Sequence, residues 1–296
     1  MKKSEKNYLT AIGYAIAAAV FYALNVPCSK LLLQDVAPTY MAAFLYLGAG
    51  LGVGFLYSRG KKKQSQRLSR KDLPYTVGMV LLDIIAPILL MTGVKLGTSA
   101  NASLLGNFEI VATTVIALLL FREKVSSRLW AAIGLITLSS MILSFGGKDS
   151  FSFSVGSLFV LGATVCWGLE NNCTRSISDK STYQIVTIKG FGSGTGALCV
   201  ALFLCETPPD LKNIPAVLLL GFVAYGLSIF TYIRAQKTLG AARTSAYYAV
   251  APFIGAFLSF LLLKESLTAA YVVALVVMIA GTALAVGDNF SINQSE

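Results

Sequence analysis

The chain has 296 residues, of which 55% are hydrophobic and only 13% are charged, and its mean hydropathy is +0.70. Soluble domains average about 25% charged residues, so this composition excludes an ordinary soluble protein. The net charge of +10 does not indicate nucleic acid, because its densest basic cluster, at residues 59–71, lacks interleaved aromatic residues. There is no histidine, and the five cysteines show no metal-ligand spacing. We therefore predict no metal site and no cofactor.

Long apolar blocks separated by short polar joints fill the sequence. A membrane-spanning helix needs about 20 mostly apolar residues, and ten such blocks are present. We predict an all-α integral membrane protein with ten transmembrane helices. In chain order the blocks are Thr10–Leu33, Thr39–Tyr57, Pro74–Lys95, Ala100–Phe121, Leu129–Gly146, Val155–Ile177, Thr182–Leu204, Ile214–Gln236, Thr244–Leu263 and Ala269–Gly287.

Basic residues gather in alternate joints of the chain. The N-terminal tail and the joints at residues 59–71 and 122–128 are basic, whereas the joint at residues 34–38 contains no Lys or Arg. Cytoplasmic loops carry the excess of Lys and Arg. We predict a multi-pass protein of the cell (plasma) membrane, in contact with membrane lipid and with both termini cytoplasmic.

Two similar segments lie half a chain apart. Phe21–Lys30 reads FYALNVPCSK, and Cys166–Arg175 reads CWGLENNCTR, at an offset of 145 residues. The second segment carries several polar groups inside an apolar block, which is costly unless they face a cavity or each other. The aligned pairs include Tyr22 with Trp167, Asn25 with Glu170 and Lys30 with Arg175.

Two runs of four alternating glycines reinforce this duplication. They occupy residues 48–54 and, 142 residues later, 190–196. Both lie inside apolar blocks, so close helix packing is favoured over phosphate binding. Five helices per copy is an odd number, which predicts an inverted repeat with a solute site at the midplane between the copies. We expect cytoplasmic tails at residues 1–9 and 288–296, and five-helix units at residues 10–147 and 155–287.

These paired motifs resemble the EamA-type members of the drug/metabolite transporter superfamily, over about residues 10–287. The resemblance implies ten helices and movement of small metabolites by alternating access. Ile110 stands where the family often has proline, which leaves a helix break open in the first copy, while Pro252 allows one in the second. The motifs that carry the resemblance are Tyr22-Ala23-Leu24-Asn25, Trp167-Gly168-Leu169-Glu170, Leu96-Gly97, Phe108-Glu109, Glu123, Glu265 and Pro252.

Carboxylates inside the apolar blocks are the strongest candidates for function. Glu170 could bind a substrate ammonium or carry a coupling proton; the structural alternative is a pair with Arg175 or a hydrogen bond from Thr174. Glu109 and Asp83 lie near the middle of adjacent blocks, which predicts two carboxylates at similar depth. They are candidates for proton coupling, or each bonds an amide or hydroxyl nearby.

Basic side chains near the block ends leave two interpretations open. Lys189, Arg175 and Arg234 could receive a substrate carboxylate or extend toward the lipid headgroups. Extension toward the headgroups is favoured for Arg234 and Lys30, and neither interpretation is favoured for Lys189.

Uncharged polar and aromatic side chains complete the predicted site. Amides orient a ligand at less cost than a full charge, and aromatic faces attract organic cations. Each of these residues alone is more often helix-packing material. The predicted substrate-binding residues are Glu170, Asn25, Glu109, Trp167, Tyr22, Asn171, Asn172, Lys189 and Tyr247, with Tyr248 as a further aromatic and Glu109, Asp83 and Glu170 as coupling candidates.

The sequence thus predicts a secondary active transporter of a small polar metabolite, amino acid-like or an organic cation, with proton coupling left open. The alternatives are a passive channel or a lipid-handling membrane protein; an enzyme is not expected. Ten helices enclose a site within one chain, so the protein is expected to be a monomer or homodimer. Glu123 and Glu265, at block ends, are predicted to stabilise the N-terminus of the next helix.

Overall fold

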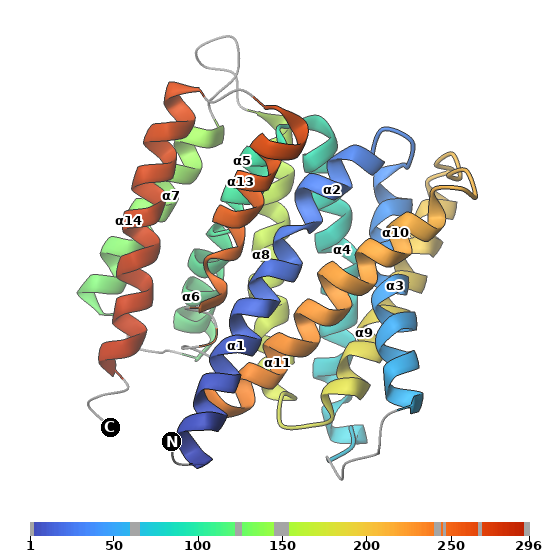
Figure 1. Ribbon diagram of the computed structural model, residues 1–296, viewed down its shortest axis with the longest axis horizontal. Coiled ribbons are helices and arrows are strands. Elements are labelled where there is room, and N and C mark those ends of the chain that lie inside the picture. The colour runs from blue at the N-terminus through green and yellow to red at the C-terminus, as the bar shows by residue number, and fades with distance from the viewer. Residues whose placement is uncertain are drawn as a thin grey trace.

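The computed structural model describes residues 3–59, 66–121, 126–144, 154–239, 244, 247–265 and 268–292. Over these residues the chain is helical and forms no β-strand, as the composition predicted. The helices form one bundle, and α1 begins at the same end of it at which α14 finishes (Figure 1).

The helices follow the apolar blocks. The first half contains α1 (Lys3–Ala23), α2 (Asn25–Leu32), α3 (Pro38–Arg59), the short 3-10 helix η1 (Arg70–Asp72), α4 (Leu73–Leu96), α5 (Ser99–Leu105), α6 (Phe108–Phe121) and α7 (Ser127–Ser144). The second half contains α8 (Val155–Ser176), α9 (Thr182–Phe203), α10 (Ile214–Gly221), the π-helical turn η2 (Phe222–Leu227), α11 (Ser228–Leu239), α13 (Ala251–Leu263) and α14 (Ala269–Ile292).

Helices of membrane-spanning length and hydropathy are present among the described residues. Five continuous helical segments qualify, and three shorter apolar helices accompany them. Helix α8 has 22 residues, but its polar segment around Glu170 lowers its hydropathy. The chain is therefore a multi-pass helical membrane protein. The five long spans are residues Asn7–Leu32, Pro38–Arg59, Arg70–Leu96, Thr182–Phe203 and Ile214–Leu239.

Several predicted blocks are interrupted near their middle. The first block changes from α1 to α2 at Leu24, and the fourth breaks between α5 and α6 at residues 106–107. This second break occurs without proline, at a turn formed by Gly106 and Asn107. The helix break that the sequence left open in the first copy is therefore present, although residue 110 is isoleucine. In the ninth block α13 begins at Ala251, so Pro252 lies in its first turn, where a missing N–H costs least.

The helical ends extend beyond the predicted blocks. Helix α1 begins at Lys3, inside the segment predicted as the N-terminal tail, and α14 continues to Ile292, inside the predicted C-terminal tail. The apolar blocks therefore locate the helices but not their ends, because a helix continues through polar residues once it has left the bilayer.

The two glycine runs bring α3 and α9 into close contact, as predicted. A Cβ atom added to Gly190 would lie 2.3 Å from the Gly50 Cα, and one added to Gly194 would lie 2.8 Å from the Leu47 nitrogen. The helices run antiparallel. Thr39, at the start of α3, donates from its amide and its hydroxyl to the Glu206 carboxylate, which lies just beyond the end of α9. The Leu68 amide, beyond the end of α3, donates to the Gln184 side chain near the start of α9.

Further helix pairs in the bundle include α4 with α8, α1 with α11, α5 with α13, and α7 with α14. Small residues allow some of these close approaches, as between Gly93 of α4 and Gly156 of α8. The α7 and α14 pair lies at one side of the bundle (Figure 1).

Two end-of-helix residues act differently from the sequence prediction. The Lys30 ammonium does not extend toward headgroups: it donates to the carbonyls of Val94, Lys95 and Gly97, at 2.6, 3.1 and 2.7 Å, and so caps the end of α4. The Glu265 carboxylate accepts from the Ser99 and Ala100 amides at 2.7 and 2.9 Å. It therefore stabilises the N-terminus of α5 rather than that of the next helix. Glu123 lies outside the described residues.

Candidate functional site

A buried lysine lies between two buried carboxylates. The Lys189 Nζ is 2.8 Å from a Glu170 oxygen and 3.1 Å from an Asp83 oxygen. The side chains of Lys189, Asp83 and Glu170 are 6%, 1% and 4% exposed. We call these three residues the acid–lysine cluster. They come from α9, α4 and α8, so both halves of the chain contribute to it.

Helix geometry explains why two members of the cluster meet. Glu170 precedes the end of α8 by nearly two turns, and Lys189 follows the start of α9 by about two turns. Both therefore lie about 10 Å from the same end of the bundle, at a rise of about 1.5 Å per residue. The Thr174 hydroxyl, one turn along α8, also donates to Glu170, as one interpretation of the sequence predicted.

Lys189 is the residue for which the sequence left two interpretations open. Its burial rules out extension to the headgroups in this structure. Its partners are two carboxylates of the protein itself. Arg175 and Arg234, in contrast, are exposed near the helix ends, and the Arg234 guanidinium lies 4.7 Å from the Phe230 ring centroid.

Glu109 lies beside the cluster and does not pair with Asp83. Its carboxylate accepts a 2.5 Å hydrogen bond from the Asn171 amide, and it lies within electrostatic range of Glu170 and Lys189. Glu109 and Asp83 therefore do not form the predicted pair: Glu109 accepts from Asn171, and Asp83 lies beside Lys189. Adjacent blocks indicated similar depth, but the rotation of each helix directs Asp83 toward α9 and Glu109 toward α8.

Aromatic side chains form a second group next to the acids. The Tyr22 ring centroid lies 6.4 Å from that of Trp167, 6.1 Å from Tyr225 and 5.8 Å from Tyr248. The Tyr46 ring lies 4.9 Å from that of Tyr225 and also faces Asp83. We call Tyr22, Tyr46, Trp167, Tyr225 and Tyr248 the aromatic cluster. Tyr46 joins it to the acid–lysine cluster.

The other two predicted amides also bond within the protein. The buried Asn25 side chain donates to the Tyr225 hydroxyl at 3.1 Å and accepts from the Ser29 hydroxyl at 3.1 Å. Asn25 thus holds the aromatic cluster at the start of α2. The Asn172 amide donates to the carbonyl of Gly168 on its own helix, so it is not directed at either cluster.

Of the two adjacent tyrosines named as candidates, only one joins the aromatic cluster. Tyr247 packs against a small apolar group formed by Ala11, Ala15, Ala235 and Leu239, whereas Tyr248 contacts Tyr22. Sequence reasoning also missed Tyr46 and Tyr225. Each lies in an apolar block close to glycine, but tyrosine in such a block is ordinary packing material, so the sequence alone carried little signal.

A small cavity adjoins the aromatic cluster. It is lined by Tyr22 and Trp167 and by residues at the helix breaks, including Gly106 and Pro252, and its volume is about 20 Å³. This is roughly the room that one water molecule needs. In this conformation the cavity is therefore too small for a metabolite.

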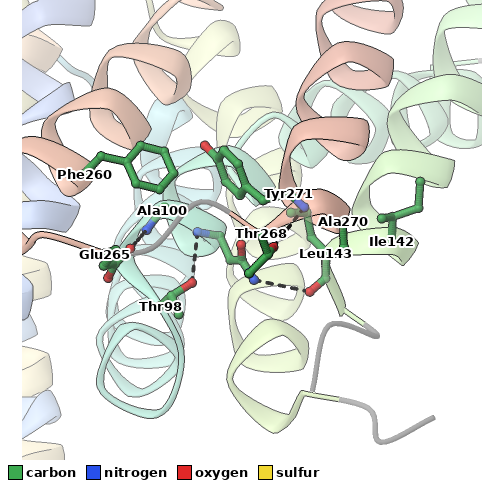
Figure 2. Close-up of a pocket in the computed structure, with 10 residues that line it drawn as sticks. Thr98, Ala100, Ile142, Leu143, Phe260, Glu265, Thr268, Ala270 and Tyr271 are labelled. Atoms are coloured by element: carbon green, nitrogen blue, oxygen red, sulfur yellow. Dashed lines mark hydrogen bonds between the residues drawn. The ribbon is translucent and has the colours of Figure 1, made fainter. Parts of the chain in front are cut away.

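A larger cavity, of about 290 Å³, lies at the bundle end opposite the described chain ends. Figure 2 shows Glu265, Phe260 and Tyr271 around it. The Asn101 side-chain amide, which also lines the cavity, donates to the carbonyl of Leu143 at 3.4 Å. None of the predicted substrate-binding residues lines it. The described residues contain no group of three or more Cys, Asp or Glu side chains arranged to hold a metal ion.

Comparisons with known proteins agree with this architecture. A relative from Methanothermobacter thermautotrophicus, named an uncharacterized transporter, is 25% identical over 286 residues, covering 90% of this chain and 83% of its own. The uncharacterized transporter YyaM of Bacillus subtilis is 22% identical over 272 residues, covering 86% and 85%. A crystal structure at 16% identity matches with a TM-score of 0.68 over 93% of this chain and 95% of its own, which shows a shared fold.

The sequence model of the EamA-like transporter family matches the chain twice, at residues 9–145 and 154–287. Each match covers one of the halves that carry the paired motifs. The chain therefore belongs to the EamA-like transporter family, a family of membrane transporters rather than enzymes.

Proposed function

We propose that this protein is a secondary active transporter that moves a small, positively charged or zwitterionic metabolite across the cell membrane by alternating access. The substrate is amino acid-like or an organic cation. The observation that carries this proposal is the acid–lysine cluster together with Glu109. If all four groups are ionised, three carboxylates and one ammonium leave two negative charges at a buried site, which favours binding of a cation or a proton.

The aromatic cluster supports the same class of substrate. Tyrosine and tryptophan rings attract cations over their faces and also accept apolar groups. Tyr22 and Trp167, which face one another, occupy matching positions in the two copies. A metabolite with an ammonium group and a short apolar part would contact both clusters at once.

The proposed architecture is ten spans in two inverted five-helix units, with both termini cytoplasmic. The helix pairing supports it: α3 pairs with α9, α5 with α13 and α7 with α14, and in each pair the helices occupy matching places in the two halves. The same correspondence converts the pair of α4 and α8 into the pair of α11 and α1, because α4 matches α11 and α8 matches α1. Such pairing is expected of a two-fold axis in the membrane plane.

Alternating access would then open the small cavity to one side of the membrane at a time. The helix breaks at Leu24, Gly106 and the start of α13 surround this region. Broken helices near a midplane site are typical of secondary transporters with repeated units. Glu109, which has only Asn171 as a hydrogen-bond partner among the described residues, is the candidate for proton coupling.

Counterflow in proteoliposomes tests the proposal. Vesicles containing the purified protein are loaded with single unlabelled amino acids or organic cations and diluted into the labelled form at several external pH values. A carrier gives a transient accumulation of label above equilibrium, whereas a channel gives none. Glu170→Gln and Glu109→Gln should reduce this exchange, with the exposed Asp210→Asn as matched control. If both variants exchange at the wild-type rate, the site assignment is wrong.

A further inference from the structure

Lys189 is unusual because its ammonium is placed where a cationic substrate would bind. It lies within 3.1 Å of carboxylates from α4 and α8, and all three side chains are nearly inaccessible. Desolvating three charges costs several kcal/mol per ion, and mutual attraction offsets this only when hydrogen bonds saturate the remaining lone pairs. A buried ion pair that only stabilises the fold is therefore expected to have hydrogen bonds to every remaining oxygen of its carboxylates.

Asp83 does not reach that saturation. Both of its oxygens are buried. The Tyr46 side chain and the Lys189 ammonium, at 3.1 Å, lie beside it, but neither oxygen receives a hydrogen bond of normal geometry from the described residues. Buried carboxylate oxygens are almost always bonded in folded proteins. Asp83 thus has acceptor capacity beside the ammonium position that the lysine leaves unused.

The lysine is attached to the tightly packed crossing of α3 and α9. Its neighbour Gly190 lies against Gly50 of α3, with room for no side chain between them. The backbone of Lys189 is therefore fixed, while the two acids belong to other helices. A small displacement of α4 or α8 relative to α9 would separate an acid from the ammonium.

We propose that the Lys189 ammonium is a tethered occupant of the substrate site, which a primary ammonium group of the substrate replaces between Asp83 and Glu170. This rests on the proposed function and narrows its substrate class to primary ammonium compounds. The tether gives both acids a shared counter-ion when the site is empty, so the empty carrier reorients with less uncompensated buried charge. Primary ammonium is favoured over quaternary cations because Asp83 requires N–H donors, which a quaternary cation lacks.

The test uses n-propylammonium, which replaces the atoms that Lys189→Ala removes beyond Cβ. Melting temperatures of the purified protein are measured in detergent while n-propylammonium chloride is titrated, with sodium chloride, tetramethylammonium chloride and 1-propanol as matched additives. The proteins are the wild type, Lys189→Ala, Lys95→Met as an exposed-lysine control, and a triple variant that adds Asp83→Asn and Glu170→Gln to Lys189→Ala.

We expect n-propylammonium to raise the melting temperature of Lys189→Ala in a saturable manner, with an apparent affinity at least tenfold above that of the wild type. The triple variant should show no such shift, because it lacks both carboxylates. Equal stabilisation by tetramethylammonium or sodium would overturn the proposal, as would equal affinity in the wild type. If Lys189→Ala does not fold, Lys189→Gly and Lys189→Ser are titrated in the same way, and absence of rescue in all variants that fold overturns it.

A second measurement separates this site from the transport proposal. Counterflow of labelled n-propylammonium is measured for the wild type and Lys189→Ala. A tethered competitor predicts a lower KM and a lower maximal rate in the variant, because the ammonium binds more tightly and leaves more slowly. A purely structural lysine predicts a lower maximal rate at unchanged KM, which contradicts the proposal. Rescue of stability in a protein that exchanges no cation in any counterflow assay would refute the proposed transport function but not the ammonium site.

Discussion

Gly190 and Gly50 lie so close that a Cβ atom added to Gly190 would meet the Gly50 Cα and nitrogen at 2.3 Å. These glycines belong to α9 and α3, so the contact joins the two halves of the chain. It also fixes the backbone next to Lys189. The alternating glycines of the sequence therefore have a packing role, and they position a charged residue of the candidate site.

Gly190→Ala should destabilise the protein, because the added methyl group meets backbone atoms that cannot move away. We expect a loss of about 1–3 kcal/mol, the usual cost of overpacking a tight contact. Thermal unfolding in detergent measures it. Gly134→Ala is the matched control, since a Cβ there meets no atom within 4 Å. Alanine favours a helix more than glycine does, so Gly134→Ala should be neutral or stabilising. An equal loss in both variants would contradict the role of the α3–α9 contact.

Lys30→Met should also lower the melting temperature. The variant removes the ammonium that bonds three carbonyls at the end of α4, and hydrogen bonds to a charged group contribute about 1.5–3 kcal/mol each. The exposed Lys95→Met, close to the same helix end, serves as control. If Lys30 instead extended to lipid headgroups, the two variants would have the same stability.

Glu265→Ala should destabilise the start of α5, because two buried amide groups lose a charged acceptor. Loss of a helix cap costs about 0.5–2 kcal/mol. Glu265→Gln keeps one acceptor oxygen and should lie between the wild type and the alanine variant. Hydrogen exchange of the Ser99 and Ala100 amides measures the effect locally. Unchanged protection of these amides in Glu265→Ala would contradict the assignment.

Asn25 and Tyr225 should be energetically coupled, because the Asn25 amide donates to the Tyr225 hydroxyl at 3.1 Å inside the bundle. In a double-mutant cycle of Asn25→Ala and Tyr225→Phe, we expect a coupling energy of about 0.5–1.5 kcal/mol, the range for one neutral hydrogen bond. Tyr232→Phe replaces Tyr225→Phe in a control cycle, since Tyr232 contacts Tyr248 while the Asn25 side chain bonds Tyr225 and Ser29. Additive effects in the Asn25–Tyr225 cycle would show that the bond does not form.

Properties that each residue carries by itself could be predicted from the sequence. Apolar blocks give helices because a bilayer leaves backbone groups no other partner. Glu170 and Glu109 were identified as candidates because a carboxylate in such a block must have a compensating partner, and both now lie beside polar groups. The glycine runs predicted close packing because a missing side chain is visible without knowing its neighbour.

Only the tertiary structure decided which groups meet. The sequence could not choose Lys189 as the partner of both Asp83 and Glu170, nor Tyr248 rather than Tyr247 as the neighbour of Tyr22. These pairings depend on the rotation of each helix about its axis, which is set by packing against segments far away in the chain. Periodicity along one helix does not contain that information, and so the partners of buried charges emerge only when the helices are assembled.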